Sequence, residues 1–137
     1  MTTVTKTVKF DAAHLLTDHA GHCKNLHGHT YRVNITVAQP DCDPHDMVID
    51  FKELKRIAIE VICDPCDHAF IYNTTSPVER EIAAVVEKNG LRTCPLPFRS
   101  TAENLARHFY GLLAERIPGL AAVQVMETED SYAEYRP

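Results

Sequence analysis

The chain has 137 residues, of which 45% are hydrophobic and 24% charged, with a formal net charge of -5. This composition is typical of a globular protein with a real core and excludes a disordered or fibrous chain, so we expect one domain spanning residues 1–137. The acidic balance argues against nonspecific nucleic-acid binding, and no apolar run reaches the roughly 20 residues that a membrane span requires.

The cysteines and the first residues bear on the cellular compartment. Five scattered cysteines, an odd number, argue against a disulfide framework. Cys63 and Cys66 have the spacing of a redox or zinc-knuckle pair, but no second pair accompanies them, and we interpret this spacing as incidental. The first residues lack the apolar stretch of a signal peptide. We therefore expect a cytoplasmic protein.

Two predicted strands bring three histidines together. Apolar and polar residues alternate over residues 4–14 and again over about 28–38, with His14 and His29 on the apolar faces. If the strands pair antiparallel, the end of the first lies beside the start of the second. His27, two residues before His29, points to the same side. We therefore predict that three imidazoles meet at one end of the sheet.

Two helices are predicted from their capping residues and from apolar positions at helical spacing. The first begins at Asp50, whose carboxylate can cap it, and Pro65 ends the apolar pattern. The second begins at Ser100, where Glu103 completes a capping box, and it stops before Pro118.

The rest of the chain completes a predicted α+β domain. Residues 121–129 and 132–135 are typical of strands, whereas residues 72–99 have no clear pattern beyond a short helix at 79–87. The order is strand, strand, helix, helix, strand, strand. This order predicts a four-stranded antiparallel sheet with two long helices on one face.

The histidines suggest a catalytic metal site. Catalytic zinc keeps three protein ligands and an open position for water or substrate, which suits His14, His27 and His29. The alternative is that they are ordinary strand histidines. Cys23, four residues before His27, is open to three interpretations: a fourth ligand, a buried apolar residue, or a reactive thiol acting as base or nucleophile.

Two further acidic positions are candidates for chemistry. Asp67 and His68 form either an acid–base relay or a solvated turn after the helix. Glu127 shares the parity of Val123 and Val125, and a carboxylate on an apolar face is costly unless it is paired. Glu127 is therefore a candidate for binding a donor-rich ligand, unless the strand ends before it.

Taken together, these motifs resemble the 6-pyruvoyltetrahydropterin synthase / 6-carboxytetrahydropterin synthase family over nearly the whole chain. They are, in order, Phe10-x-Ala-Ala-His14, Cys23-x3-His27-Gly-His29, Val48-Ile-Asp-Phe-x-Glu-Leu-Lys55, Asp67-His68, Ser100-Thr-Ala-Glu-Asn104 and Glu127-Thr128. Several motifs in the right order are far more specific than any one alone.

The resemblance implies a fold, an assembly and a set of site residues. The fold is the tunnelling fold (T-fold), in which subunits join their sheets into barrels, commonly as hexamers with active sites between subunits. The implied residues are the zinc ligands His14, His27 and His29, the proton-abstracting Cys23, the relay pair Asp67 and His68, the pterin-anchoring Glu127 with Thr128 beside it, and Thr101 as a further pocket residue.

The implied substrate is 7,8-dihydroneopterin triphosphate. Zinc would bind its side-chain oxygens and acidify a C–H bond, the thiolate would take the proton, and triphosphate would be eliminated. The cysteine–histidine spacing and short N-terminus resemble the bacterial 6-carboxytetrahydropterin branch, which also releases acetaldehyde on the path to queuosine. The alternatives are the pyruvoyl reaction, without side-chain cleavage, and a non-catalytic pterin- or zinc-binding protein. Residues 76–99 are longer than the family pattern and leave the product open.

Overall fold

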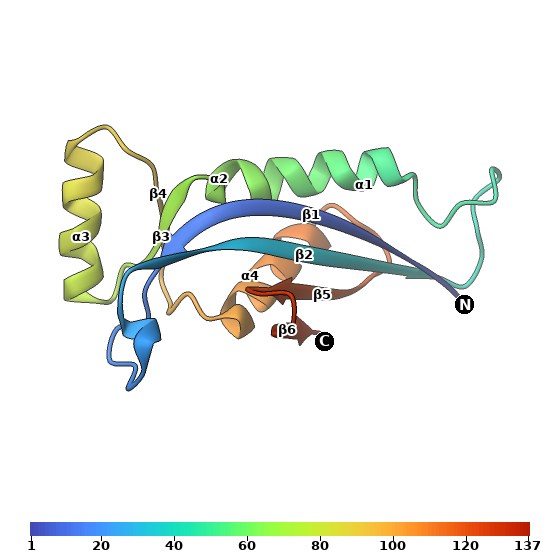
Figure 1. Cartoon of the computed structure of the whole chain (residues 1–137). Helices are drawn as coiled ribbons and strands as arrows, with labels where there is room; N and C mark the ends of the chain where they lie inside the picture. Colours follow the sequence, from blue (N-terminus) through green and yellow to red (C-terminus); the bar gives the residue numbers. More distant parts are fainter.

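A long antiparallel ribbon organises the fold, and a computed structural model describes it together with all other residues, 1–137. The sheet contains six strands in the order β4-β3-β1-β2-β5-β6 (Figure 1). The strands are β1 (Thr2–His14), β2 (His27–Gln39), β3 (Ala69–Asn73), β4 (Thr93–Leu96), β5 (Leu120–Met126) and β6 (Tyr132–Tyr135). The helices are α1 (Phe51–Ala58), α2 (Asp64–Cys66), α3 (Pro77–Lys88) and α4 (Ala102–Ala114), with a π-type turn η2 (Ile59–Cys63) and a 3-10 turn η1 (His22–Lys24).

The β1–β2 ribbon confirms the predicted antiparallel pairing. The two strands are in register from the pair Thr2–Gln39 to the pair His14–His27. Because side chains alternate between the faces of a strand, this register sets His14, His27 and the core side chains on one face. The predicted alternation therefore fixes both the core and the site.

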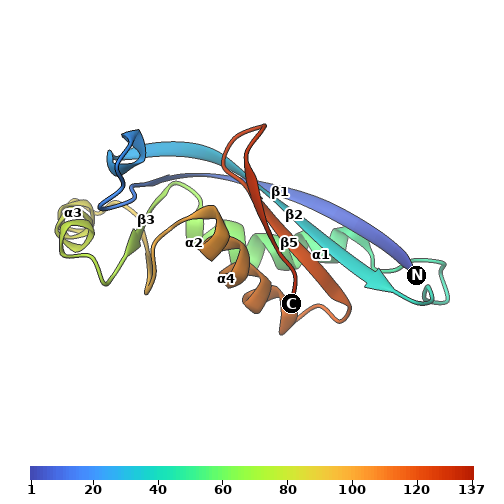
Figure 2. The same cartoon turned by 90° about the horizontal axis from the view of Figure 1, so that it is seen from below.

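The main core lies between the sheet and α1, η2 and α4. These helices cover the same face of the sheet (Figure 2), as the sequence predicted for its two long helices. The largest fully buried side chains of this core are Tyr31, Phe109, Ile35, Leu54, Ile62, Ile71, Leu105, Leu113 and Ile117.

The prediction of a four-stranded antiparallel sheet in the order ββααββ was wrong in two respects. β3 runs parallel to β1 and β4 parallel to β3, so the sheet is six-stranded and mixed. The short helix predicted at 79–87 is present as α3, but it packs on the opposite face from the two long helices, where Leu15, Phe70 and Ala83 form a second small core. Both differences lie within or directly before residues 72–99, whose pattern was unclear. β3 is covered on both faces and so lacks alternation, and β4 has only four residues, one of them a proline.

The two long helices begin where the sequence predicts, except that the cap of α4 is Thr101 and not Ser100. Asp50 caps α1 by accepting a hydrogen bond from the Lys52 N–H at 2.8 Å. The helix continues through η2 past Pro65 to Cys66. A proline has no N–H with which to continue an α-helical ladder, and the π-type turn precedes it. No helix is both long enough and apolar enough to cross a bilayer.

Candidate active site

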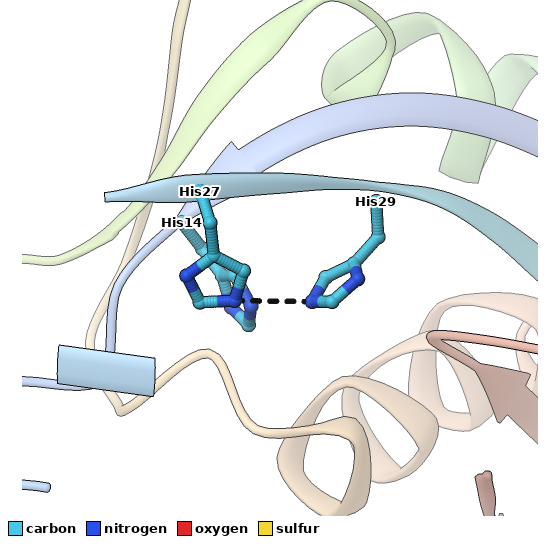
Figure 3. Close-up of side chains that lie close together, drawn as sticks. All are labelled: His14, His27 and His29. Carbon is cyan, nitrogen blue, oxygen red and sulfur yellow. Dashed lines mark hydrogen bonds between the residues drawn. The ribbon is translucent and has the colours of Figure 1, made fainter. Parts of the chain in front are cut away.

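Three histidines converge where β1 ends and β2 begins. His14, His27 and His29 turn their rings toward one point (Figure 3), and one ring nitrogen from each lies within 4.8 Å of the others. The Nε2 atoms of His27 and His29 are 3.1 Å apart. His14 is 1% exposed, and the other two are partly buried. The predicted convergence is therefore present in the structure.

Hydrogen bonds at the far nitrogen fix two of the three tautomers. The Nδ1–H of His14 donates to the Ser100 carbonyl at 2.9 Å, with Ser100 Oγ at 3.0 Å. The Nδ1–H of His27 donates to the Asn25 carbonyl at 2.7 Å. Since a carbonyl only accepts, Nε2 of both rings carries a lone pair. The Nε2 of His14 is buried without a hydrogen-bond partner.

These features fit a metal ion. A buried lone pair without a partner is costly, and here it faces two more imidazoles. Metal-binding histidines characteristically donate their other N–H to a carbonyl or carboxylate, as His14 and His27 do. Burial, reinforced by His27 and His29, lowers the pKa of His14 to about 4. Burial and the proximity of His27 also lower the pKa of His29. The lowered pKa values of His14 and His29 favour the neutral imidazole, which is the form that binds a metal.

Glu127 lies beside the histidine cluster. Its Oε2 is 3.9 Å from Nε2 of His29, and its side chain is 27% exposed. Burial, followed by the charge of Glu103, raises the pKa of this carboxyl. β5 ends one residue earlier, at Met126, so Glu127 is not on the strand itself, yet it remains half-buried. It lines a cavity of about 370 Å³ together with Gly28, His29, Thr30, Arg32, Thr128 and Glu129.

Asp67 and His68 form a close pair through their side chains. Nδ1 of His68 is 2.9 Å from Oδ2 of Asp67. The backbone N–H of Asp11, more than His68 itself, lowers the pKa of the Asp67 carboxyl. His68 is held in the left-handed region, at φ 58°, while its N–H donates to the Asp11 carbonyl at 2.6 Å. A side chain with this backbone conformation is uncommon and is frequently functional.

The Asp67–His68 pair lies on the opposite face of the sheet from the histidine cluster. His68 lines a cavity of about 740 Å³, on the side where α3 packs, together with Thr30, Phe70, Arg92 and one residue of the cluster, His29. Its side chain is 74% exposed. Within one chain, no hydrogen bond or ion pair joins this pair to the three histidines.

The remaining predicted residues lie around the histidine end of the ribbon. Cys23 is half-buried in η1, within the connection between β1 and β2 (Figure 1). Thr101 caps α4, and its Oγ1 accepts a hydrogen bond from the Asn104 N–H at 3.2 Å. The Thr128 hydroxyl donates to Asp130 at 2.9 Å. Their catalytic and binding roles stay predictions.

Sequence reasoning gave Ser100 the wrong role. The helix cap is Thr101, one residue later, because Ser100 is fully buried against His14. The serine lies 86 positions from that histidine, so no local spacing could have indicated the contact. The one available signal was a Ser-Thr dipeptide, in which either residue is able to cap a helix.

Comparisons with known proteins agree on one family. A family model described as 6-pyruvoyl tetrahydropterin synthase matches residues 3–137. A Haemophilus influenzae protein named 6-carboxy-5,6,7,8-tetrahydropterin synthase is 40% identical over an alignment of 137 residues that covers 97% of each chain. An Aquifex aeolicus protein of the same name is 37% identical over 123 residues, covering 83% of this chain and 75% of the relative.

Solved structures show the same fold at lower identity. An uncharacterized protein from Wolinella succinogenes has a TM-score of 0.83 at 18% identity, covering 98% of this chain and 97% of its own. The 6-pyruvoyl tetrahydropterin synthase of Caenorhabditis elegans has a TM-score of 0.72 at 24% identity, covering 99% and 95%.

Proposed function

Because the chain belongs to the 6-pyruvoyl tetrahydropterin synthase family, we propose that it is a 6-carboxy-5,6,7,8-tetrahydropterin synthase. This lyase converts 7,8-dihydroneopterin triphosphate to the carboxy product with release of acetaldehyde and triphosphate, on the path to 7-deazaguanine compounds such as queuosine. The observation that carries the proposal is the three-histidine cluster in a chain whose full-length relatives bear this name.

We propose zinc as the metal held by His14, His27 and His29. Support comes from the three imidazoles, the buried Nε2 of His14 without a partner, and the N–H groups of His14 and His27 donated outward. Bound zinc would polarise the oxygens of the substrate side chain. Ser100 and Asn25 keep two of the ligands in the binding tautomer.

In this proposal, Cys23 accepts the proton from the substrate carbon. The connection that carries it flanks the two strand ends where the histidines lie, and its partial burial leaves the thiol accessible to a ligand. Glu127 orients the pterin, because a carboxylate oxygen accepts hydrogen bonds from N–H and NH2 groups on a ring edge. Thr128 and Thr101 are proposed to line the same pocket.

A second copy of the chain would supply the Asp67–His68 pair. Since the pair lies on the opposite face of the sheet from the histidines, one chain offers an incomplete set of catalytic groups. We propose a homo-oligomer, a hexamer as the family resemblance implies, in which the relay of one subunit faces the metal ligands of another. The unpaired edges of β4 and β6 are compatible with such pairing.

The test is incubation of purified, metal-analysed protein with 7,8-dihydroneopterin triphosphate, with every product identified. Acetaldehyde together with triphosphate is the expected result. Triphosphate without acetaldehyde would assign the 6-pyruvoyl reaction instead, and tight binding without either product would assign a non-catalytic pterin-binding protein.

Variants separate the proposed roles. Cys23→Ala should retain the metal and lose turnover, whereas loss of the metal would make Cys23 a ligand. Mixing subunits of Cys23→Ala with subunits of His68→Ala should restore part of the activity if the site is shared between chains. If each site is built within one chain, every mixed oligomer stays inactive, because each chain lacks one group.

A further inference from the structure

Two cysteines with no part in the proposed reaction lie in contact at the edge of the sheet. Cys66 is the last residue of α2 and Cys94 lies in β4, and their Sγ atoms are 3.9 Å apart. Both are free thiols. A disulfide has an S–S distance of about 2.05 Å, so an approach of about 2 Å, shared between two side chains, would join them.

The neighbouring Cys63 is not part of this contact, although it has the sequence spacing of a redox pair with Cys66. Its thiol donates to the Lys9 carbonyl at 3.6 Å, away from Cys94. Burial raises the pKa of the Cys63 thiol to about 11. The partner of Cys66 is therefore distant in sequence, and the Cys-x-x-Cys spacing is incidental, as the sequence indicated.

The contact gives the two thiols different reactivities. Either sulfur can be the donor of the hydrogen bond between them. With Cys66 as the donor, this bond, assisted by the Arg92 guanidinium, lowers the pKa of Cys94. The same contact and burial raise the pKa of Cys66. A thiolate is the nucleophile in cysteine oxidation, and the lowered pKa of Cys94 favours it as the attacking sulfur, with Cys66 as its partner.

A surface groove gives small molecules access to the pair. Cys66 is 2% and Cys94 8% exposed. Both line a groove of about 720 Å³, whose other walls come from η2, α2, β4 and α4 and include Val61, Pro65, Arg92, Pro95, His108 and Leu112. The nearly complete burial of the sulfurs selects a small oxidant such as hydrogen peroxide over a bulky disulfide.

We propose that Cys66 and Cys94 are an oxidation site at which hydrogen peroxide forms a reversible intramolecular disulfide. The Cys94 thiolate attacks one peroxide oxygen, giving a sulfenic acid and releasing hydroxide. The Cys66 sulfur then displaces the sulfenic hydroxyl as its thiol proton leaves, forming the S–S bond and water. In total, two thiols lose two hydrogens and one peroxide becomes two waters.

The disulfide would join covalently two elements that are distant in sequence. It ties the end of α2 to the edge strand β4 and closes the chain between residues 66 and 94. Cys66 immediately precedes Asp67, so the crosslink holds the backbone next to the Asp67–His68 pair. Formation of the bond does not depend on the proposed reaction.

The test treats the purified full chain with hydrogen peroxide, blocks remaining thiols under denaturing conditions, and maps disulfides by mass spectrometry after digestion. The expected result is a monomer in which Cys66 is joined to Cys94, with full reversal by dithiothreitol. Cys66→Ser and Cys94→Ser should each abolish the crosslink. The matched control Cys63→Ser should keep it.

Two results would overturn the proposal. One is a wild-type map in which Cys66 and Cys94 both remain alkylated at peroxide doses that fully oxidise the exposed Cys42. The other is a crosslink that joins a different pair, such as Cys63 and Cys66. The wild-type map decides the question even if a serine variant fails to fold.

Discussion

Acidification should destabilise the metal-free protein through His14. In the folded chain, burial, with help from His27 and His29, lowers the pKa of His14 to about 4. In the unfolded chain the pKa returns to its ordinary value of 6.5. Between these two values the unfolded chain binds a proton that the folded chain does not. The free energy of unfolding therefore keeps the full His14 contribution above about pH 6.5 and loses it progressively as the pH falls toward 4.

The two pKa values set the size of the effect. For a single group with these values, moving from about pH 8 to about pH 5 lowers the free energy of unfolding by about 2 kcal/mol. The complete loss, below the folded pKa, is about 3 kcal/mol. Because His14 is almost fully buried, solvent screening reduces these figures little. Such a change is a large part of the 5–15 kcal/mol typical of a domain.

The assay compares wild type with His14→Gln, both stripped of metal by a chelator. Urea unfolding is followed by circular dichroism at the two pH values, since the chain has no tryptophan to report by fluorescence. The wild type should lose about 2 kcal/mol more than the variant on acidification. The pKa of His29 is also lowered and that of Glu127 is raised. Both groups are present in wild type and variant, so their contributions largely cancel when the two proteins are compared.

An equal loss in the two proteins would refute this reasoning, because the destabilisation would then come from groups other than His14. Added zinc supplies an independent check. It should stabilise the wild type near pH 7, since metal binding to the folded state adds to its stability. In His14→Gln the same zinc concentration should stabilise much less.

Three further predictions follow from the backbone and the ligand supports. His68→Gly should be more stable than His68→Ala by about 1 kcal/mol in urea unfolding, because glycine accepts the left-handed conformation at φ 58°. Both variants lose the imidazole, so equal stabilities would contradict this reasoning. Gly119→Ala should cost about 3 kcal/mol, since a Cβ would lie 2.7 Å from a backbone carbonyl of the neighbouring strand. Gly90→Ala, with a similar positive φ but open space around it, should cost only about 1 kcal/mol, and equal losses would show that the contact is unimportant. Ser100→Ala should weaken zinc binding about 10-fold in a competitive chelator titration by removing one of the groups that orient His14, while unchanged affinity would leave the carbonyl as sufficient support.

The ribbon and its histidines could be predicted because they depend on one repeated local pattern. Alternation over β1 and β2 determines which face each side chain occupies, and antiparallel pairing places His14 opposite His27. The pairing of the two strands was an assumption, and strong alternation on both sides of one connection made it a sound one. The same parity set Ala12 opposite His29.

What could not be predicted depends on contacts without a local pattern. β3 is buried from both sides, so its sequence reads as an apolar run without alternation. Its parallel pairing with β1 involves only Ala12 with Ala69 and Ala13 with Phe70. The face of the sheet on which Asp67 and His68 lie follows from that pairing, so this face could not be predicted from the sequence either.

Glu127 shows a limit of parity arguments. The sequence placed it on the apolar face of a strand that in fact ends at Met126. Strand ends are set by turn and pairing geometry, which extend over only a few residues. Its proximity to His29 comes from where the chain leaves the strand.

The register of the β1–β2 ribbon also has a consequence for folding. His14 and His27 are separated by 13 positions along the chain, whereas Thr2 and Gln39, at the other end, are separated by 37. The entropy cost of closing the chain is about 0.9 kcal/mol smaller at the histidine end. Pairing of β1 with β2 therefore starts most favourably at the histidine cluster and extends away from it. A metal captured there early would hold the two strands in the register that every later pair requires.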